Sequence, residues 1–392
     1  MSEPTATRPS RSSEQEAGRT ERSRIGTAGT HPLLRCERAV SRPAADTRRG
    51  DPIEWKMFEG LDSMRRLQGA MLDIFGLGPI ETPHETVFSK PGVSLRRYGG
   101  EDASGPPVLI VPAPIKRPYI WDLAPGVSVV HRCLAAGSRV FLVEWQQTPQ
   151  DLGLADYADR LILACVDAIG KTPVTLLAHS LGGLFAAIFS ALHPERVRSL
   201  VLLAAPLHFA ARVGIFARMA SELDGNSLPA SVPGSFLSFA SFRASPETFG
   251  WDRSLDLARS LPEAEALLNH LRVERWTLDE FALPRRLVAE LAELIAREDR
   301  FVQGTLTLRG RQAAPSGILS PLLCVVDPRC RVVPPESVLP FYASVGSTDK
   351  TLIHYDGDVG VSLQHIGVLV GREAHRQLWP KILRWTSARW QD

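Results

Sequence analysis

Ser180 lies in the segment Ala178-His179-Ser180-Leu181-Gly182, with a small residue two positions before the serine and another two positions after it. This pattern approximates the G-x-S-x-G turn, in which a strand passes tightly into a helix and presents the serine as a nucleophile. Small residues such as Ala178 and Gly182 let neighbouring backbone approach the turn. We therefore predict an acyl intermediate on Ser180, with an ordinary structural serine as the alternative.

A serine hydroxyl is a poor nucleophile near neutral pH, so Ser180 needs a base within hydrogen-bond reach and an acid that orients the base. With this turn, the usual chain order is Ser, then Asp or Glu, then His. His365 follows the last predicted strand and precedes the final helical pattern, so it is the predicted base. Asp327 leads directly out of the preceding strand and is the predicted orienting acid. Asp356 and Asp358 remain alternatives to it.

The negative charge that develops on an attacked carbonyl oxygen requires backbone N–H donors, one from the residue after the nucleophile and one from the loop after an earlier strand. Leu181 is expected to supply the first donor. In the loop after Val108-Leu-Ile-Val, Pro112 and Pro114 have no N–H. The second donor is therefore Ala113 or Ile115.

Short apolar runs alternate with longer helical patterns in the part of the chain that must position these residues. The predicted strands are 108–112, 139–145, 174–178, 197–203, 321–326 and 351–355, after a hairpin at 87–98. The predicted helices between them are 122–136, 154–169 and 181–193. Continuous apolar strands that alternate with helices are typical of a mostly parallel sheet covered on both faces. Reactive groups collect beyond the carboxyl ends of such strands, where Ser180 is expected.

The chain divides into segments of different composition. Residues 1–54 are rich in Arg, Ser and Pro without periodicity, which predicts a disordered tail. It is either without chemistry or a basic arm that touches a partner. Residues 55–80 form a predicted N-terminal helix whose apolar stripe is expected to pack into the core. That stripe comprises Met57, Leu61, Met64, Leu67, Met71 and Phe75.

The predicted α/β core comprises residues 81–206 and 301–392, interrupted by an insertion at 207–300. The insertion carries long helical patterns and aromatic stretches, so it is expected to be a helical cap or lid over the site. A helical insertion that stabilises the edge of the sheet is the alternative.

Composition excludes several classes of protein. The formal net charge is +2 over 392 residues, with acidic and basic residues interleaved, so no nucleic-acid partner is predicted. The five cysteines show no Cys-x-x-Cys spacing, which argues against a disulfide framework or a zinc site. Neither a signal-peptide core nor an apolar run of about 18 residues is present. We expect a cytoplasmic protein without a metal, a cofactor or a transmembrane segment.

From about Val87 to Trp385 the chain resembles the α/β-hydrolase superfamily, and more narrowly the catalytic domain of polyhydroxyalkanoate (PHA) synthases. The segments that carry the resemblance are VLIVPAPIKRPYIWDL (108–123), VFLVEW (140–145), the turn with SLGG, FVQGTLTLRGR (301–311), RVVPPES (331–337) and QHIGVLVG (364–371). The resemblance implies an α/β-hydrolase fold with a mostly parallel sheet, helices on both faces and a helical cap.

The chain departs from this family at three positions. PHA synthases carry cysteine where this chain has Ser180, and glycine where it has Ala178. Their triad aspartate lies just before the (H/R)-x-V-P run, a position that falls here on Cys330 rather than on Asp327. Only His365 keeps the family's triad residue.

These features lead to one main expectation and two alternatives. The main expectation is a serine hydrolase that acts on a hydroxyacyl ester or thioester through an acyl-serine, because an activated serine commonly passes its acyl group to water. The first alternative, implied by the resemblance, is a synthase-like acyltransferase that uses 3-hydroxyacyl coenzyme A as substrate. The second is a catalytically silent relative that binds PHA granules or a synthase partner.

Overall fold

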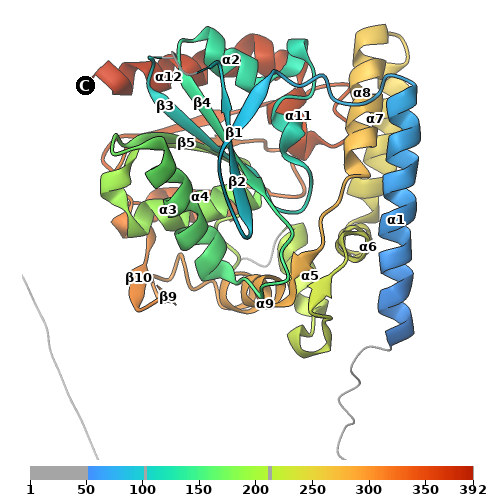
Figure 1. Ribbon diagram of the computed structural model, residues 1–392, viewed down its shortest axis with the longest axis horizontal. Helices are drawn as coiled ribbons and strands as arrows, with labels where there is room; N and C mark the ends of the chain where they lie inside the picture. The colour runs from blue at the N-terminus through green and yellow to red at the C-terminus, as the bar shows by residue number, and fades with distance from the viewer. Residues whose placement is uncertain (1–51, 101–103, 211–213, 392) are drawn as a thin grey trace, which may run out of the picture. The chain divides into compact units, whose positions relative to one another are not determined.

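The computed structural model describes residues 52–100, 104–210 and 214–391 (Figure 1). Of the predicted tail at 1–54, residues 1–51 lie outside this described part of the chain. Within it, no helix is both long enough and apolar enough to cross a membrane.

The described residues form an eight-stranded sheet in the order β1-β2-β4-β3-β5-β6-β11-β12. The strands are β1 (His84–Lys90), β2 (Val93–Tyr98), β3 (Pro107–Val111), β4 (Arg139–Trp145), β5 (Val174–His179), β6 (Val197–Leu203), β11 (Leu322–Val326) and β12 (Lys350–His354). Neighbours from β4 to β12 are parallel, whereas β2 is antiparallel to both β1 and β4. This confirms the predicted mostly parallel sheet, including the hairpin at its edge.

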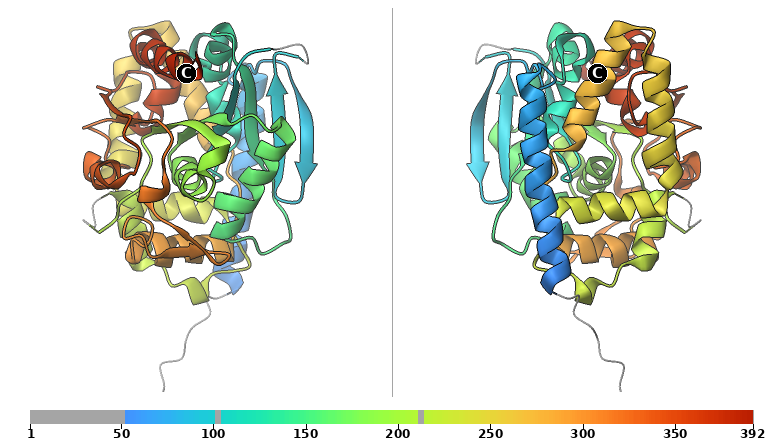
Figure 2. Two further views of the ribbon diagram at one scale, coloured as in Figure 1. Left: turned by 90° about the vertical axis from the view of Figure 1, so that its left-hand side faces the viewer. Right: turned by 90° about the vertical axis from the view of Figure 1, so that its right-hand side faces the viewer.

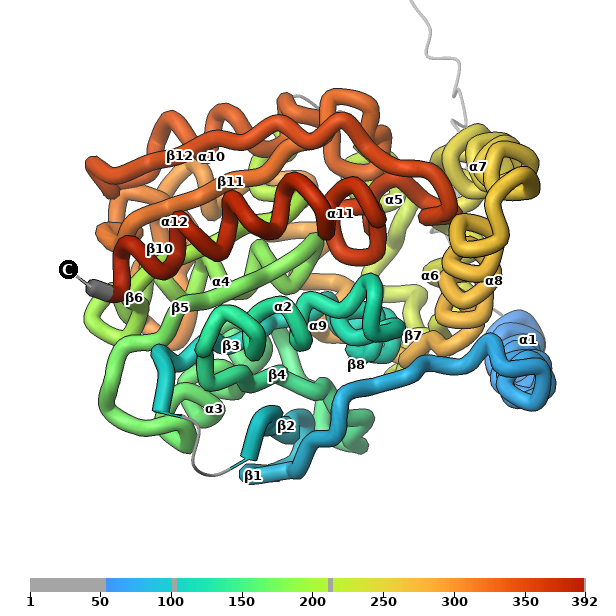
Figure 3. The backbone as a smooth tube through the Cα atoms, turned by 90° about the horizontal axis from the view of Figure 1, so that it is seen from above, coloured from blue at the N-terminus to red at the C-terminus, as the bar shows by residue number. Residues whose placement is uncertain are grey.

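Helices cover both faces of the sheet because successive side chains of each strand point to opposite sides. In β3, Leu109 and Val111 belong to one buried apolar cluster, and Val108 and Ile110 to the other. The first cluster includes residues of α3 (Leu161–Ile169) and α4 (Leu181–Leu192). The second includes residues of α2 (Val129–Ala135), α11 (Gln364–Val370) and α12 (Trp379–Gln391). Figure 3 shows α2, α11 and α12 together on one side of the strands. A short helix, α10 (Leu339–Ser344), connects β11 to β12.

The helix expected at 122–136 is shorter than predicted. Pro125 has no backbone N–H, and the chain forms a 3₁₀ turn at Pro125–Val127 before α2 begins. Ser128 then caps α2, because its Oγ accepts a hydrogen bond from the N–H of His131 at 2.8 Å.

Between β6 and β11 the chain leaves the sheet and forms the cap helices. They are α5 (Ile215–Glu222), α6 (Gly234–Ala244), α7 (Asp252–Ser260), α8 (Ala264–Thr277) and α9 (Arg285–Glu290). Two short ribbons accompany them, β7 (Ser231–Val232) with β8 (Leu283–Pro284) and β9 (Leu306–Leu308) with β10 (Arg311–Ala313). Figure 1 shows the cap helices beside one end of the sheet and below it.

The N-terminal helix α1 (Pro52–Ile74) contradicts one expectation. Its apolar stripe was expected in the core, but Met64 is 67% exposed and Phe75, just beyond the helix, is 76% exposed. The right-hand view of Figure 2 shows α1 running along the outside of the cap helices.

Polar contacts hold the inner face of α1. Asp62 is buried and accepts a hydrogen bond from the N–H of Ser235 at 2.7 Å, at the N-terminus of α6, where a carboxylate is favourable. Asp73 forms a two-point ion pair with Arg275 of α8 at 2.6 and 2.7 Å. Helical periodicity identifies the residues that share a face, but these contacts decide which face is buried.

Candidate active site

Ser180 occupies the turn between β5 and α4 in a conformation that non-glycine residues rarely adopt, with φ 54° and ψ −132°. Such left-handed backbone is strained and persists only where the surrounding structure imposes it. The Ser180 N–H donates to the carbonyl of Leu203 at 3.1 Å, and the Ser180 carbonyl accepts from Gly183 at 2.9 Å. The turn therefore holds Ser180 by its backbone and leaves the side chain free to react.

The two small residues that flank the serine differ in how much space surrounds them. A Cβ atom on Gly182 would lie 2.2 Å from the carbonyl oxygen of Val111 at the end of β3, so no larger residue fits without moving backbone. Ala178 is fully buried at the end of β5, and the sheet accommodates its methyl group. The close approach that the sequence pattern predicts is therefore real at Gly182.

The fold brings His365 to Ser180 across 185 residues of chain. His365 is the second residue of α11, and its Nε2 lies 2.9 Å from Ser180 Oγ. Burial, together with the nearby His179 ring, holds the pKa of His365 well below its usual value. At neutral pH the imidazole is therefore uncharged, which is the form that can take a proton from the serine.

The position of the orienting acid differs from the sequence prediction. Asp327 was expected to contact His365, but its Oδ1 accepts from the N–H of Arg329 at 2.8 Å, and its buried Oδ2 has no hydrogen-bond partner among the described residues. His365 Nδ1 instead faces Cys330, with 3.6 Å between Nδ1 and Sγ. The reserve acid Asp358 accepts hydrogen bonds from the N–H groups at the start of the segment after α11.

Cys330 takes the orienting position as a neutral group. Burial raises the pKa of its thiol to about 12, although the N–H of Val333 lies 3.4 Å from Sγ. A neutral thiol neither fixes the imidazole tautomer strongly nor stabilises an imidazolium ion. Cys330 lies in a tight turn that begins at Asp327. This turn directs the Cys330 thiol, rather than the Asp327 carboxylate, toward His365.

His179 has a role that the sequence did not suggest. Its Nε2–H donates to the backbone carbonyl of His365 at 2.8 Å. The two imidazole ring centroids are 4.6 Å apart. Burial lowers the pKa of His179 to about 4, so it is a neutral donor that fixes the backbone of the base. Its position next to the nucleophile was the available sequence signal.

The predicted oxyanion donors lie around one cavity with the serine. Leu181 is the first residue of α4, so its N–H has no acceptor within the helix. Ala113 and Ile115 follow β3 and line the same cavity as Ser180 and Leu181. The carbonyl of Ile115 accepts from Phe281 at 2.8 Å, which ties this loop to the segment after the cap helix α8.

The cavity has a volume of about 550 Å³, and residues of the cap helices form much of its lining. Most of its lining is apolar and aromatic. The aromatic members are Phe58, Trp121, Phe209, Phe216, Phe239, Phe242, Phe249 and Trp276. Such a lining excludes water and suits an acyl chain.

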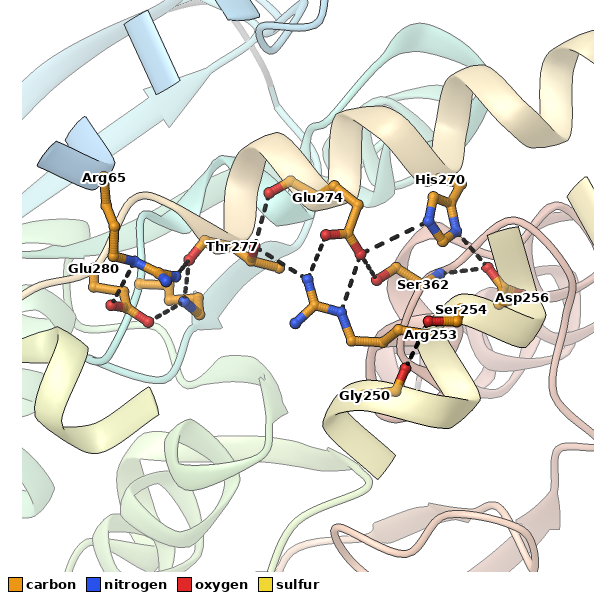
Figure 4. Close-up of polar contacts among 11 residues, drawn as sticks. Arg65, Gly250, Arg253, Ser254, Asp256, His270, Glu274, Thr277, Glu280 and Ser362 are labelled. Atoms are coloured by element: carbon orange, nitrogen blue, oxygen red, sulfur yellow. Dashed lines mark hydrogen bonds and ion pairs between the residues drawn. The ribbon is translucent and has the colours of Figure 1, made fainter. Parts of the chain in front are cut away.

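Basic side chains also line the cavity, namely Arg65, Lys116, Arg117 and Arg253, and no described acidic side chain does so. Glu280 lies behind this wall and pairs with Lys116 at 2.7 Å and with Arg65 at 3.2 Å. Burial alone would raise the pKa of Glu280, but Lys116 and Arg65 outweigh it and hold that pKa below its usual value. Figure 4 shows Arg65 of α1 and Glu280 at one end of a row of polar contacts that runs along α8. No sequence pattern predicted a role for these residues.

Comparisons with known proteins agree with the fold. The alpha/beta hydrolase fold family model matches residues 55–265. The chain is similar to the poly(3-hydroxyalkanoate) polymerase subunit PhaC of Allochromatium vinosum, with 27% identity over 84% of this chain and 96% of that protein. The PhaC subunit of Haloferax mediterranei is 30% identical, over 79% of this chain and 64% of that protein.

Among solved structures, the enol-lactonase from Burkholderia xenovorans matches with a TM-score of 0.50 and 14% identity, over 78% of this chain and all of that one. At this identity the likeness supports the fold alone.

Proposed function

The chain belongs to the α/β-hydrolase fold family, and on that premise we propose that it transfers hydroxyacyl groups from coenzyme A thioesters to a hydroxyl group through an acyl-serine at Ser180. The observation that carries the proposal is the 2.9 Å contact between Ser180 Oγ and His365 Nε2 beside an apolar cavity. The similarity to poly(3-hydroxyalkanoate) polymerase subunits supports the choice of a hydroxyacyl substrate.

In the first half of the reaction, His365 Nε2 takes the proton of Ser180 as Oγ attacks the thioester carbonyl. The N–H of Leu181, with that of Ala113 or Ile115, stabilises the oxyanion. The C–S bond then breaks, the imidazolium returns its proton to the departing thiol, and the hydroxyacyl group remains on Ser180 as an oxyester.

In the second half, a hydroxyl group attacks this oxyester with His365 again as the base. Most of the cavity lining is apolar, which supports an organic molecule that carries a hydroxyl group, rather than water, as the acceptor. The acceptor hydroxyl could belong to another hydroxyacyl unit, in which case repeated transfer lengthens a polyester.

Hydrolysis is the second candidate function, and the nucleophile favours it. A serine oxyester is more stable than the thioester that a cysteine would form. Transfer of its acyl group to another alcohol is therefore close to neutral in free energy, whereas hydrolysis of the oxyester lowers the free energy. A neutral thiol at Cys330 would slow both reactions, since the imidazolium in each transition state lacks a carboxylate partner.

One experiment separates these functions. Wild type and Ser180→Ala are incubated with 3-hydroxybutyryl coenzyme A and with a short aryl ester, and thiol release, phenol release and product size are followed. The proposed transferase releases thiol and forms oligomers, whereas a hydrolase releases thiol and forms free hydroxy acid. Equal rates for the two proteins would refute the assignment of Ser180.

The silent-relative alternative makes a different prediction, that a fluorophosphonate leaves Ser180 unlabelled while the protein still binds polyester granules. A granule as partner and a cytoplasmic location stay predictions.

A further inference from the structure

The loop that leads into α11 is strained immediately before the proposed base. Ser362, three residues ahead of His365, has φ 59°, and Gly360 has φ 80°. A Cβ on Gly360 would lie 2.6 Å from the carbonyl oxygen of Ala266 in α8, so the loop presses against a cap helix. Left-handed backbone at a non-glycine residue requires support from its surroundings.

A buried carboxylate of the cap supplies that support. Asp256 of α7 accepts hydrogen bonds from the N–H of Gly360 at 3.1 Å and from the N–H of Ser362 at 2.8 Å. The same carboxylate accepts from His270 Nδ1 at 2.7 Å. Asp256 therefore satisfies two backbone donors of the strained loop, and His270 of α8 holds it in position.

Glu274 and Asn269 of α8 extend the contact. Glu274 accepts from the hydroxyl of Ser362 and also pairs with Arg253, which lines the cavity. Figure 4 shows Asp256, His270, Glu274 and Ser362 meeting at this point. Asn269 Nδ2 donates to the carbonyl of Gly360 at 2.6 Å and to that of Val370, the last residue of α11, at 3.0 Å. The cap thus contacts both the loop that leads into the helix of the base and the last residue of that helix.

We propose that Asp256, held by His270, is a positioning residue that sets the place of His365 relative to Ser180, so that the cap and not only the sheet determines the geometry of catalysis. The inference rests on the proposed acyl-serine chemistry. It assigns to the cap a role beyond covering the substrate, because a shift of the strained loop moves His365 directly.

The test uses the full chain with the substitution Asp256→Asn, which keeps the size of the side chain but replaces one acceptor oxygen with a donor. The rate at which a fluorophosphonate labels Ser180 is measured as a function of probe concentration. A misplacement of about 1 Å costs on the order of 100-fold in rate, so we expect a 10- to 100-fold lower maximal rate with an unchanged half-saturating concentration. The matched control is Glu263→Gln, which removes an exposed contact between the cap and Arg372 without touching the loop.

A double substitution distinguishes positioning from general loosening of the fold. If Asp256 acts through the base, Asp256→Asn causes no further loss of labelling in a His365→Ala background. An equal loss in both backgrounds, or wild-type labelling by Asp256→Asn, would overturn the inference. If Asp256→Asn does not fold, as judged by its thermal transition, His270→Gln is used instead, and wild-type labelling by that folded variant overturns it equally.

The outcome for the proposed function is read separately. Failure of the wild-type protein to label at Ser180 would refute the acyl-serine mechanism itself. Normal wild-type labelling with no effect of the cap substitutions would refute only the positioning role of Asp256.

Discussion

The contact between His365 and Cys330 leads to a test in which a substitution should raise activity. Cys330→Asp would place a carboxylate where a neutral thiol now lies 3.6 Å from His365 Nδ1. A carboxylate extends further from its Cα atom than a thiol does, so one oxygen comes within hydrogen-bond distance of Nδ1. The N–H of Val333, now 3.4 Å from Sγ, is in place to bind the other oxygen.

The expected gain follows from the charge on His365 during the reaction. A hydrogen bond to a charged group contributes about 1.5–3 kcal/mol, and the imidazolium exists only after His365 has taken the serine proton. Most of that free energy therefore stabilises the transition state. At about 1.4 kcal/mol for each tenfold change, acylation should accelerate roughly 10- to 100-fold. Position 330 is buried and lies near Asp327, and both features disfavour a charged carboxylate there. We therefore expect a gain in rate below the roughly 10⁴-fold effect of a triad aspartate.

The assay is the initial burst of phenol from a short aryl ester at pH 7, with the thermal transition of each variant recorded in parallel. Cys330→Asn is the matched control, since it has the size of aspartate without the charge, and it should show no gain. If both variants fold and Cys330→Asp is no faster than Cys330→Asn, Cys330 does not occupy the orienting position.

Three further predictions concern pH, the turn and the N-terminal helix. Burial holds the pKa of both His179 and His375 at about 4, below the ordinary 6.5, so the unfolded chain binds protons that the folded chain cannot. The free energy of unfolding in urea should therefore decrease as the pH is lowered from about 6.5 to about 4, by roughly 3 kcal/mol per histidine. A free energy of unfolding that does not change over this range would show that these histidines accept protons in the folded protein. Gly182→Ala should lower fluorophosphonate labelling of Ser180 on the order of 100-fold, because the added methyl group would displace the backbone at the end of β3. Labelling at the wild-type rate would mean that the turn has room for this methyl group. Met64→Gln should change the free energy of unfolding by less than about 0.5 kcal/mol, and a loss near 2 kcal/mol in thermal melts would mean that the stripe on α1 is buried.

The elements that could be predicted from the sequence are those whose own pattern determines them. The strand predicted at 139–145 matches β4, and those at 174–178 and 197–203 match β5 and β6 to within one residue. These strands are largely buried on both faces, so most of their residues are apolar and they are easy to recognise. The helix expected at 122–136 was too long, because Pro125 and the Ser128 cap delay its start.

The stripe on α1 shows where such patterns stop being informative. The spacing of Met57, Met64 and Met71 predicts correctly that they share one face of a helix. The burial of the opposite face depends on partners far along the chain, such as the α6 N-terminus for Asp62 and Arg275 for Asp73. No local pattern contains that information.

The α/β architecture, the turn that carries Ser180 and the place of His365 after the last strand could be predicted from the sequence, because these features follow from short-range periodicity and chain order. Two contacts could be identified only in the folded chain: Cys330, and not Asp327, faces the imidazole, and Asp256 of the cap accepts a hydrogen bond from the loop before α11. Hydrogen bonds form or fail over tenths of an ångström, and these join segments that are widely separated in the chain. Such distances are set by how helices and loops pack on the sheet rather than by the residues next to each group.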